Sequence, residues 1–141
     1  HQLFTESVID ELLISMKSPN EKEAFEILAQ LGLSTYAKRH PMSLSGGEKQ
    51  RVAIATALAS DREYIILDEP TSGLDYKHMK EVGLCLKHLK KLGKTVFVIT
   101  HDVELIYHCC TYVMHIEKGK VINQFAIDKS THKFLKDYFI L

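Results

Sequence analysis

The sequence predicts an α/β domain in which a mostly parallel sheet follows an all-helical block. Three observations predict it. Apolar residues recur at helical spacing through residues 1–60. Residues 64–67 and 96–99 are continuous apolar runs, which are typical of parallel strands covered on both faces. The stretch between these runs, starting near Asp75, has a helical pattern, and strands that alternate with helices favour a parallel sheet.

Composition narrows the class of protein. The chain has 141 residues, of which 45% are hydrophobic, so it has the size of one ordinary domain and should not be disordered. Eighteen basic side chains balance eighteen acidic ones, so composition gives no reason to expect nucleic acid as a partner. The longest apolar stretches are far too short to cross a membrane.

The three cysteines, Cys85, Cys109 and Cys110, are an odd number with two adjacent members. This pattern does not fit a disulfide framework and favours a reducing compartment. His108 beside the adjacent pair raises the alternative of a metal site. No second pair of ligands occurs at the spacing of a zinc site, so we predict no metal there.

Two helices are expected before residue 41. The first opens at Thr5, and its apolar side chains repeat at helical spacing: Val8, Ile9, Leu12 and Leu13. The second has Ser18 as N-cap, Pro19 at its first position and Glu21 completing a capping box. Gly32 should end it. Its predicted buried stripe is Ala24, Phe25, Ile27, Leu28 and Leu31.

Residues 44–51, LSGGEKQR, form a polar turn that opens a helix over about 47–59. Ser45 can cap this helix, and Glu48 can complete a capping box. The two glycines leave the first backbone N–H groups accessible, so an anion can approach the positive end of the helix dipole. An ordinary well-capped helix start is the alternative interpretation.

Polar residues follow both apolar runs. Asp68, Glu69 and Pro70 end the first, and a turn over 71–75 then leads to a helix that Asp75 can cap and that ends near Leu92. The second run stops at 100–102, where His101 lies.

Ligands of open parallel sheets bind beyond the carboxyl ends of the strands. Two neighbouring carboxylates at such an end repel each other unless a cation or a proton offsets their charge, so Asp68 and Glu69 suggest a magnesium-dependent hydrolase. The alternatives are a solvated acidic pair that caps a turn and, for His101, a structural role at the strand end.

The carboxyl-terminal part should contain a helix, a β-hairpin and a short terminal helix. A helix is expected to about residue 108, followed by strands over 112–116 and 121–125. The segment 117–120 between them has the pattern of a hairpin turn. A short terminal helix is predicted over 130–139.

Four segments together resemble the motifs of the ABC ATPases. Residues 44–51 resemble the signature motif, 64–69 the Walker B strand with its catalytic glutamate, 72–75 the D-loop and 99–102 the switch-histidine segment. They occur in the family's order and at its usual spacing, and the resemblance covers essentially the whole chain. The resemblance implies part of a P-loop NTPase (RecA-like) fold, with a mostly parallel sheet and an all-helical subdomain.

The resemblance also implies roles. Asp68 would help to hold Mg²⁺, Glu69 would act as general base, and His101 would contact the γ-phosphate of ATP. A second ABC ATPase domain, in a homodimer or a heterodimer, would bind most of the nucleotide that the signature motif clasps. The signature residues are Ser45, Gly46 and Gly47. Two D-loop residues would lie at the dimer seam: Ser72 and Asp75.

Some family features are missing. Glu48 stands where glutamine is commoner, and an acid near a triphosphate is unfavourable unless it turns back into the capping box. The phosphate-binding pattern Gly-x-x-x-x-Gly-Lys-Ser/Thr does not occur, because His88 occupies the first glycine position before Gly93-Lys94-Thr95. The adenine-stacking aromatic and the Q-loop glutamine are also missing. Residues 2–4, QLF, resemble the stretch after the Q-loop in ATPases of cobalt-type and energy-coupling-factor importers.

We therefore expect the carboxyl-terminal portion of an ABC nucleotide-binding domain, truncated at the amino end. Its expected parts are a helical subdomain over 1–60, half of the ATPase core over 61–128 and a terminal helix over 129–141. These residues alone should bind ATP weakly, lack hydrolase activity and expose an unpaired apolar strand edge.

The favoured function is the ATPase of a membrane importer, bound to a transmembrane subunit at the cytoplasmic face of the membrane. The helical block, from Thr5 to about Pro41, would dock on that subunit. One alternative is a soluble ABC ATPase of the translation or repair type. Another is a non-enzymatic assembly module that contributes only in trans.

Overall fold

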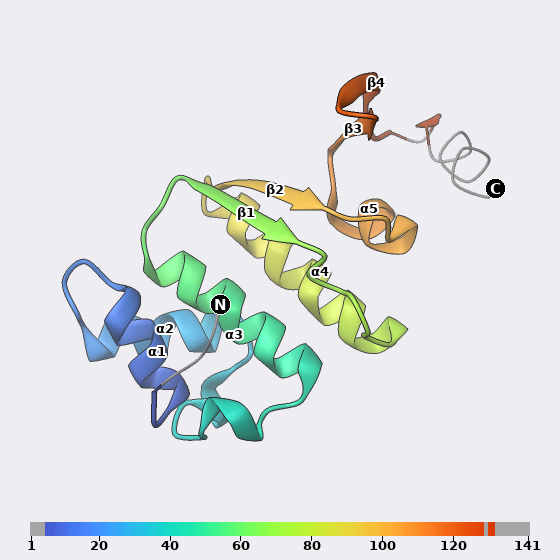
Figure 1. Ribbon diagram of the computed structural model, residues 1–141. Coiled ribbons are helices and arrows are strands. Elements are labelled where there is room, and N and C mark those ends of the chain that lie inside the picture. The colour runs from blue at the N-terminus through green and yellow to red at the C-terminus, as the bar shows by residue number, and fades with distance from the viewer. Residues whose placement is uncertain (1–4, 129, 132–141) are drawn as a thin grey trace. The chain divides into compact units, whose positions relative to one another are not determined.

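A computed structural model describes residues 5–128 and 130–131 of the chain. Its residues form two compact units, His1–Thr100 and His101–Leu141, each of which is described by itself (Figure 1). Among the described residues, no helix combines the length and the apolar character that a bilayer crossing requires.

The first unit begins with a helical block. Helices α1 (Val8–Ser15) and α2 (Glu21–Gln30) are followed by two short 3₁₀ turns, η1 (Ser34–Tyr36) and η2 (Pro41–Ser43). The predicted periodicity is confirmed, because the apolar stripes of both helices are largely buried. The block has a dense core that includes Leu12, Leu28 and Leu33.

The predicted starts of these two helices are wrong by a few residues. Ser7 caps α1 in place of Thr5, and the Asn20 side chain caps α2 by accepting the Glu23 N–H at 3.2 Å. Asparagine caps at least as well as serine, so the helix begins after Pro19 and the Ser18–Glu21 capping box does not form. Phe25 was predicted to be buried, but it is 37% exposed.

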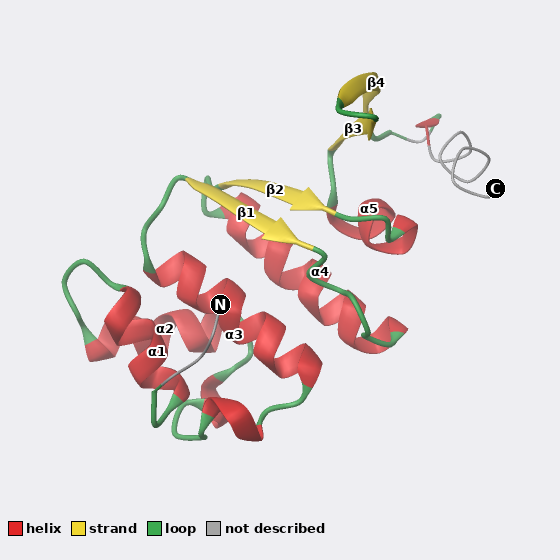
Figure 2. Ribbon diagram, viewed as in Figure 1, coloured by secondary structure: helices red, strands yellow, loops and turns green. Residues whose placement is uncertain are grey.

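Helices α3 (Gly46–Ala59) and α4 (Tyr76–Lys91) lie side by side (Figure 2). Their predicted caps are confirmed: Ser45 and Glu48 form the capping box of α3, and Asp75 caps α4. Helix α3 also packs against α1 and α2, and small residues such as Ala55 and Ala59 permit these close contacts.

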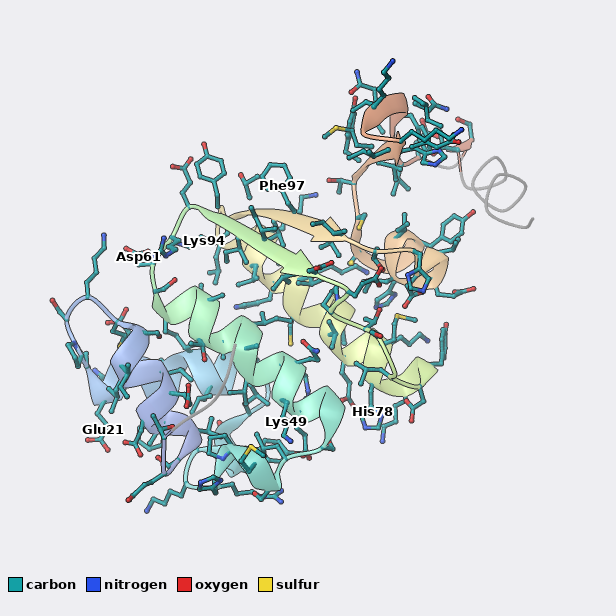
Figure 3. All side chains as sticks on the ribbon, viewed as in Figure 1. Glu21, Lys49, Asp61, His78, Lys94 and Phe97 are labelled. Carbon is teal, nitrogen blue, oxygen red and sulfur yellow. The ribbon has the colours of Figure 1, made fainter. Side chains whose placement is uncertain are left out.

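Strands β1 (Tyr64–Asp68) and β2 (Thr95–Ile99) form a parallel pair, as predicted, with Asp68 opposite Ile99. An ion pair joins the segments that enter them, with Lys94 Nζ 2.9 Å from Asp61 Oδ1 (Figure 3). Helix α4 packs on β2.

The prediction that both faces of these strands are covered is not confirmed for the described part of the chain. Ile65 is only 5% exposed, but its neighbour Ile66 on the opposite face is 69% exposed. Phe97 is exposed in β2 as well (Figure 3), and so is Ile99. The pair therefore has one largely covered face and one open apolar face. The expected unpaired edge is a separate feature: in the described part of the chain, this sheet contains only β1 and β2.

The second unit contains α5 (Val103–Cys109) and an antiparallel hairpin of β3 (Tyr112–Glu117) and β4 (Lys120–Ala126). The predicted hairpin turn is confirmed, with positive φ angles of 48° at Lys118 and 75° at Gly119, as a tight primed turn requires. Ile106 and Val113 form a small core. The predicted terminal helix lies outside the described residues, apart from its first two positions.

Candidate functional site

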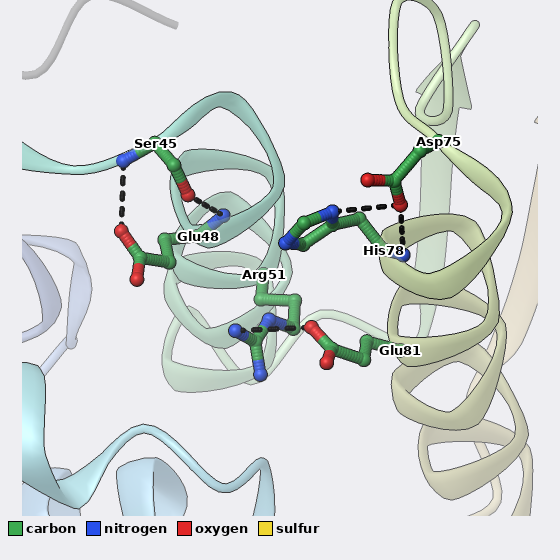
Figure 4. Close-up of polar contacts among 6 residues, drawn as sticks. All are labelled: Ser45, Glu48, Arg51, Asp75, His78 and Glu81. Atoms are coloured by element: carbon green, nitrogen blue, oxygen red, sulfur yellow. Dashed lines mark hydrogen bonds and ion pairs between the residues drawn. The ribbon is translucent and has the colours of Figure 1, made fainter.

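The start of α3 is closed by a reciprocal pair of hydrogen bonds (Figure 4). The Glu48 N–H donates to Ser45 Oγ at 3.4 Å, and the Ser45 N–H donates to Glu48 Oε2 at 2.7 Å. The second of these bonds is the main reason that the pKa of Glu48 lies below its ordinary value. Glu48 is thus turned back into the capping box, and Ser45 is exposed.

Two glycines form the first turn behind Ser45. Their N–H groups have no partner within the helix, because the first amides of any α-helix lack one. A Cβ on Gly46 would lie 3.6 Å from Leu74 Cδ2, and a Cβ on Gly47 would lie 3.0 Å from His78 Cβ and Cδ2. Gly46 therefore lies against Leu74 in the segment that leads into α4, and Gly47 lies against the first turn of α4 itself.

The carboxylate pair lies at the end of β1. Asp68 is the last residue of the strand and is exposed. Glu69 has a positive φ of 46°, an uncommon conformation for a residue other than glycine, and such outliers concentrate at functional sites. The Glu69 N–H donates to the Ile99 carbonyl at 2.8 Å, and the Thr100 hydroxyl donates to Glu69 Oε2 at 3.2 Å. These contacts hold the glutamate in a defined orientation beyond the strand ends.

The carboxylate pair suits Mg²⁺. In the described part of the chain, no three His, Cys, Asp or Glu side chains gather where they could share a metal ion. Magnesium in nucleotide enzymes is bound by one or two carboxylates, several waters and the phosphates, without a protein cage. An exposed Asp68 beside an oriented Glu69 fits that donor set.

The turn after Glu69 positions the predicted D-loop. The Ser72 N–H donates to the Glu69 carbonyl at 3.1 Å, and the Leu74 N–H donates to the Thr71 carbonyl at 3.0 Å. Thr71 is buried, whereas Ser72 is exposed. The turn thus ties the D-loop directly to the glutamate.

Asp75 ends this turn and has two bonds to one residue. Its Oδ1 accepts the His78 N–H at 2.9 Å and lies 2.8 Å from His78 Nδ1 (Figure 4). These two bonds hold the pKa of Asp75 below its ordinary value, and the bond from the His78 backbone N–H has the larger effect.

His101 belongs to the second unit, where it is exposed and precedes Asp102. The Asp102 side chain caps α5 by accepting the Leu105 N–H at 3.1 Å. Of the predicted site residues, the structure brings Gly46 against Leu74 of the D-loop and joins the D-loop to Glu69. His101 is described only within its own unit.

Two residues that contact the candidate site residues were not predicted from the sequence: Thr100 and His78. Thr100 could have been found from the sequence, because pairing the two strand ends in register places the residue after β2 beside Glu69. His78 carried no such signal, since its contact with Gly47 joins two helices that are distant in sequence.

The chain is similar to known proteins over most of its length. A sequence profile of the ABC transporter family matches residues 1–72. An ABC transporter ATP-binding protein of Treponema denticola is 43% identical over 129 residues, which are 92% of this chain and 26% of that protein. The chain thus spans about a quarter of the length of that relative.

Solved structures agree with the sequence relatives. The cbiO1 protein of Clostridium perfringens, part of the ABC transporter complex cbiONQ, has a TM-score of 0.81 at 32% identity, over 96% of this chain and 56% of that one. A dimeric ATP-binding cassette in a post-hydrolysis state, bound to ADP and phosphate, has a TM-score of 0.68 at 30% identity, over 88% of this chain and 61% of that one. The fold is therefore that of P-loop NTPases, and the 141 residues belong to the family of ABC transporter ATP-binding domains.

Proposed function

We infer that these residues are the part of an ABC transporter ATPase that contributes the signature motif, the Walker B carboxylates and the switch histidine to composite ATP sites between two ATPase domains. The dimeric cassette among the structural neighbours supports the pairing of two domains. The names of the relatives support a role in transport over the alternative of a soluble translation or repair ATPase.

The observation that carries this proposal is the conformation of Glu69. A left-handed backbone for a glutamate is unfavourable, and here two bonds, to the Ile99 carbonyl and from the Thr100 hydroxyl, maintain it. A carboxylate that only capped a turn would need neither the strain nor the second bond. The arrangement supports a catalytic role for the Glu69 carboxylate, because its orientation is fixed before substrate binds.

Glu69 would act as the general base. Its carboxylate would accept a proton from the water whose oxygen attacks the γ-phosphorus, while the bond to the bridging oxygen breaks and ADP leaves. Asp68 would help to hold Mg²⁺, which neutralises charge on the phosphates when it is bound. The Thr100 bond would keep Glu69 pointed at the water.

The signature residues would act on the nucleotide of the opposite domain. Ser45 and Gly46 are exposed, whereas Gly47 is buried against His78. The amides of the two glycines would donate to the γ-phosphate of that nucleotide at the positive end of α3. Ser72 and Asp75 would lie at the seam between the domains, and His101 would contact the γ-phosphate in its own domain.

The proposal implies ATP and Mg²⁺ as ligands, a second ABC ATPase domain and a transmembrane subunit as partners, and a place at the cytoplasmic face of the membrane. It leaves the assignment to cobalt-type or energy-coupling-factor importers as a prediction.

Glu69→Gln tests the proposal in the intact ATPase that carries these residues. The amide has the same shape and can still accept the Thr100 hydroxyl bond, but it cannot take a proton. We expect hydrolysis to fall roughly 100- to 10,000-fold, the usual range for loss of a general base, with ATP binding retained. Hydrolysis within a few-fold of wild type would refute the role of Glu69.

A further inference from the structure

The helix starts of α3 and α4 meet at one histidine. The His78 ring lies between Asp75, to which its Nδ1 is 2.8 Å distant, and the first turn of α3, where Gly47 faces it (Figure 4). Because a carboxylate can only accept, the 2.8 Å contact requires the proton on Nδ1. The ring is thus fixed on one side by the D-loop and on the other by the signature helix.

The contact with His78, and not the backbone conformation, explains why glycine occupies position 47. Its φ is not among the positive angles of the chain, so any residue could adopt its conformation. Within a helix, glycine is less favourable than alanine by about 1 kcal/mol. An alanine Cβ, however, would lie 3.0 Å from His78 Cβ and Cδ2 and 3.1 Å from Cγ.

His78 has little freedom to move out of the way. Its Cβ is attached directly to the α4 backbone, and its ring is held by Asp75. About one turn further along α3, Arg51 Nη2 lies 3.3 Å from Glu81 Oε2, and this ion pair joins the two helices a second time. A bulkier residue at position 47 would therefore have to push the two helices apart.

We propose that His78 is a positioning residue that locks the signature glycine Gly47 to the D-loop Asp75, so that these two segments keep one fixed arrangement toward the partner domain. The consequence for catalysis rests on the function proposed above. The lock itself does not, because it is a packing relation within the first unit. Loss of the ring should weaken turnover more than it weakens ATP binding, since most of the nucleotide contacts lie elsewhere.

The first experiment measures thermal unfolding of the 141-residue chain. Gly47→Ala should lower the Tm by roughly 3–8 °C through overpacking. Gly46→Ala makes the same change one residue earlier, where the nearest atom is 3.6 Å away, and should leave the Tm within about 1 °C or raise it. Equal effects of the two alanines would overturn the proposal.

The deciding variant combines Gly47→Ala with His78→Gly, which removes the ring and the Cβ together. In the His78→Gly background, Gly47→Ala should no longer destabilise and should even raise the Tm, because alanine is the better helix former. If Gly47→Ala alone does not fold, recovery of a cooperative transition in the double variant supports the lock, and failure to recover overturns it. Additive Tm shifts also overturn it.

The second experiment measures ATPase activity in the intact ATPase. His78→Ala should lower kcat roughly 5- to 20-fold, as expected for one lost hydrogen bond and its alignment, with KM for ATP within about two-fold. His78→Asn keeps a donor near the position of Nδ1 and should restore most of kcat. Lys77→Ala, an exposed neighbour on the same turn, is the control and should behave as wild type.

The two experiments separate the possible failures. An inactive wild-type protein would count against the proposed function and leave the stability result to decide the lock. Normal kcat in His78→Ala, or no rescue by His78→Asn, would overturn the positioning role even if the Tm shifts are coupled.

Discussion

The Glu48 carboxylate stabilises the start of α3 in a way that depends on pH. Its carboxylate accepts the Ser45 N–H, and this bond lowers its pKa in the folded chain. A group whose folded pKa is depressed stabilises the fold above its unfolded pKa of 4.5 and loses that contribution as the pH falls through the folded value. The stabilising effect is therefore present at neutral pH and absent in acid.

Glu48→Gln should remove this pH dependence. The amide oxygen can still accept the Ser45 N–H, so the capping box persists, but the side chain no longer titrates. We expect the Tm of wild type to fall more steeply than that of the variant between about pH 6 and about pH 3. Circular dichroism melts across that range measure the difference, and parallel profiles would contradict it.

The three cysteines differ in reactivity for local reasons. Burial raises the pKa of the Cys85 thiol to about 11, and the residue is only 4% exposed. A side-chain hydrogen bond with Cys109 lowers the pKa of Cys110, and both of these thiols are partly accessible. The thiolate is the reactive form, so reactivity should follow these environments.

Alkylation at pH 8 should therefore be selective. Only about one Cys85 thiol in a thousand is ionised at that pH, so iodoacetamide should modify Cys110 first and Cys85 only after unfolding. Peptide mapping by mass spectrometry gives the order of labelling, and the chain in guanidinium, where all three cysteines should react, is the control. Early labelling of Cys85 in the folded chain would show that α4 does not bury it.

At the scale of elements, the sequence was most informative where the signal is local. The caps of α3 and α4 and the turn between β3 and β4 were predicted correctly because each depends on residues that lie within a few positions of one another. The cap of α2 was missed because Ser18 and Asn20 are both good caps, and the local pattern does not choose between them.

Burial of the strands was harder to predict. An apolar run indicates that a strand can be covered on both faces, but cover comes from elements distant in sequence. In the described part of the chain, α4 packs on one side of the pair, and Ile66, Phe97 and Ile99 stay exposed. The contact of His78 with Gly47 escaped prediction for the same reason.

The open face of the β1–β2 pair should drive self-association of the 141-residue chain. Ile66→Thr keeps a β-branched residue in the strand but removes apolar surface, so it should reduce association and leave the Tm nearly unchanged. Ile65→Thr is the matched control on the buried face and should cost roughly 1.5–3 kcal/mol of stability. Sedimentation velocity and thermal melts distinguish the two variants, and association unaffected by Ile66→Thr would contradict the role of this face.

At the scale of the whole molecule, the residues proposed to act in catalysis come from separate segments of the chain. The signature start, the D-loop and the carboxylate pair belong to the first unit, and His101 belongs to the second. Motif order and spacing allowed these segments to be predicted together, because each motif is short and contiguous. In the proposed function their joint action would depend on a second domain, and the sequence of one chain does not specify how two domains would meet.

The 141-residue chain should bind ATP only weakly by itself. High affinity for a nucleoside triphosphate comes from a loop whose successive N–H groups and lysine surround the phosphates, and the sequence contains no Gly-x-x-x-x-Gly-Lys-Ser/Thr pattern. The remaining donors, at the start of α3, offer one turn of helix dipole, worth about 1 kcal/mol at an exposed site. Isothermal calorimetry with Mg²⁺ and ATP should give no dissociation constant for ATP below about 0.1 mM. A submicromolar Kd would mean that the chain holds a phosphate site of a kind its motifs do not indicate.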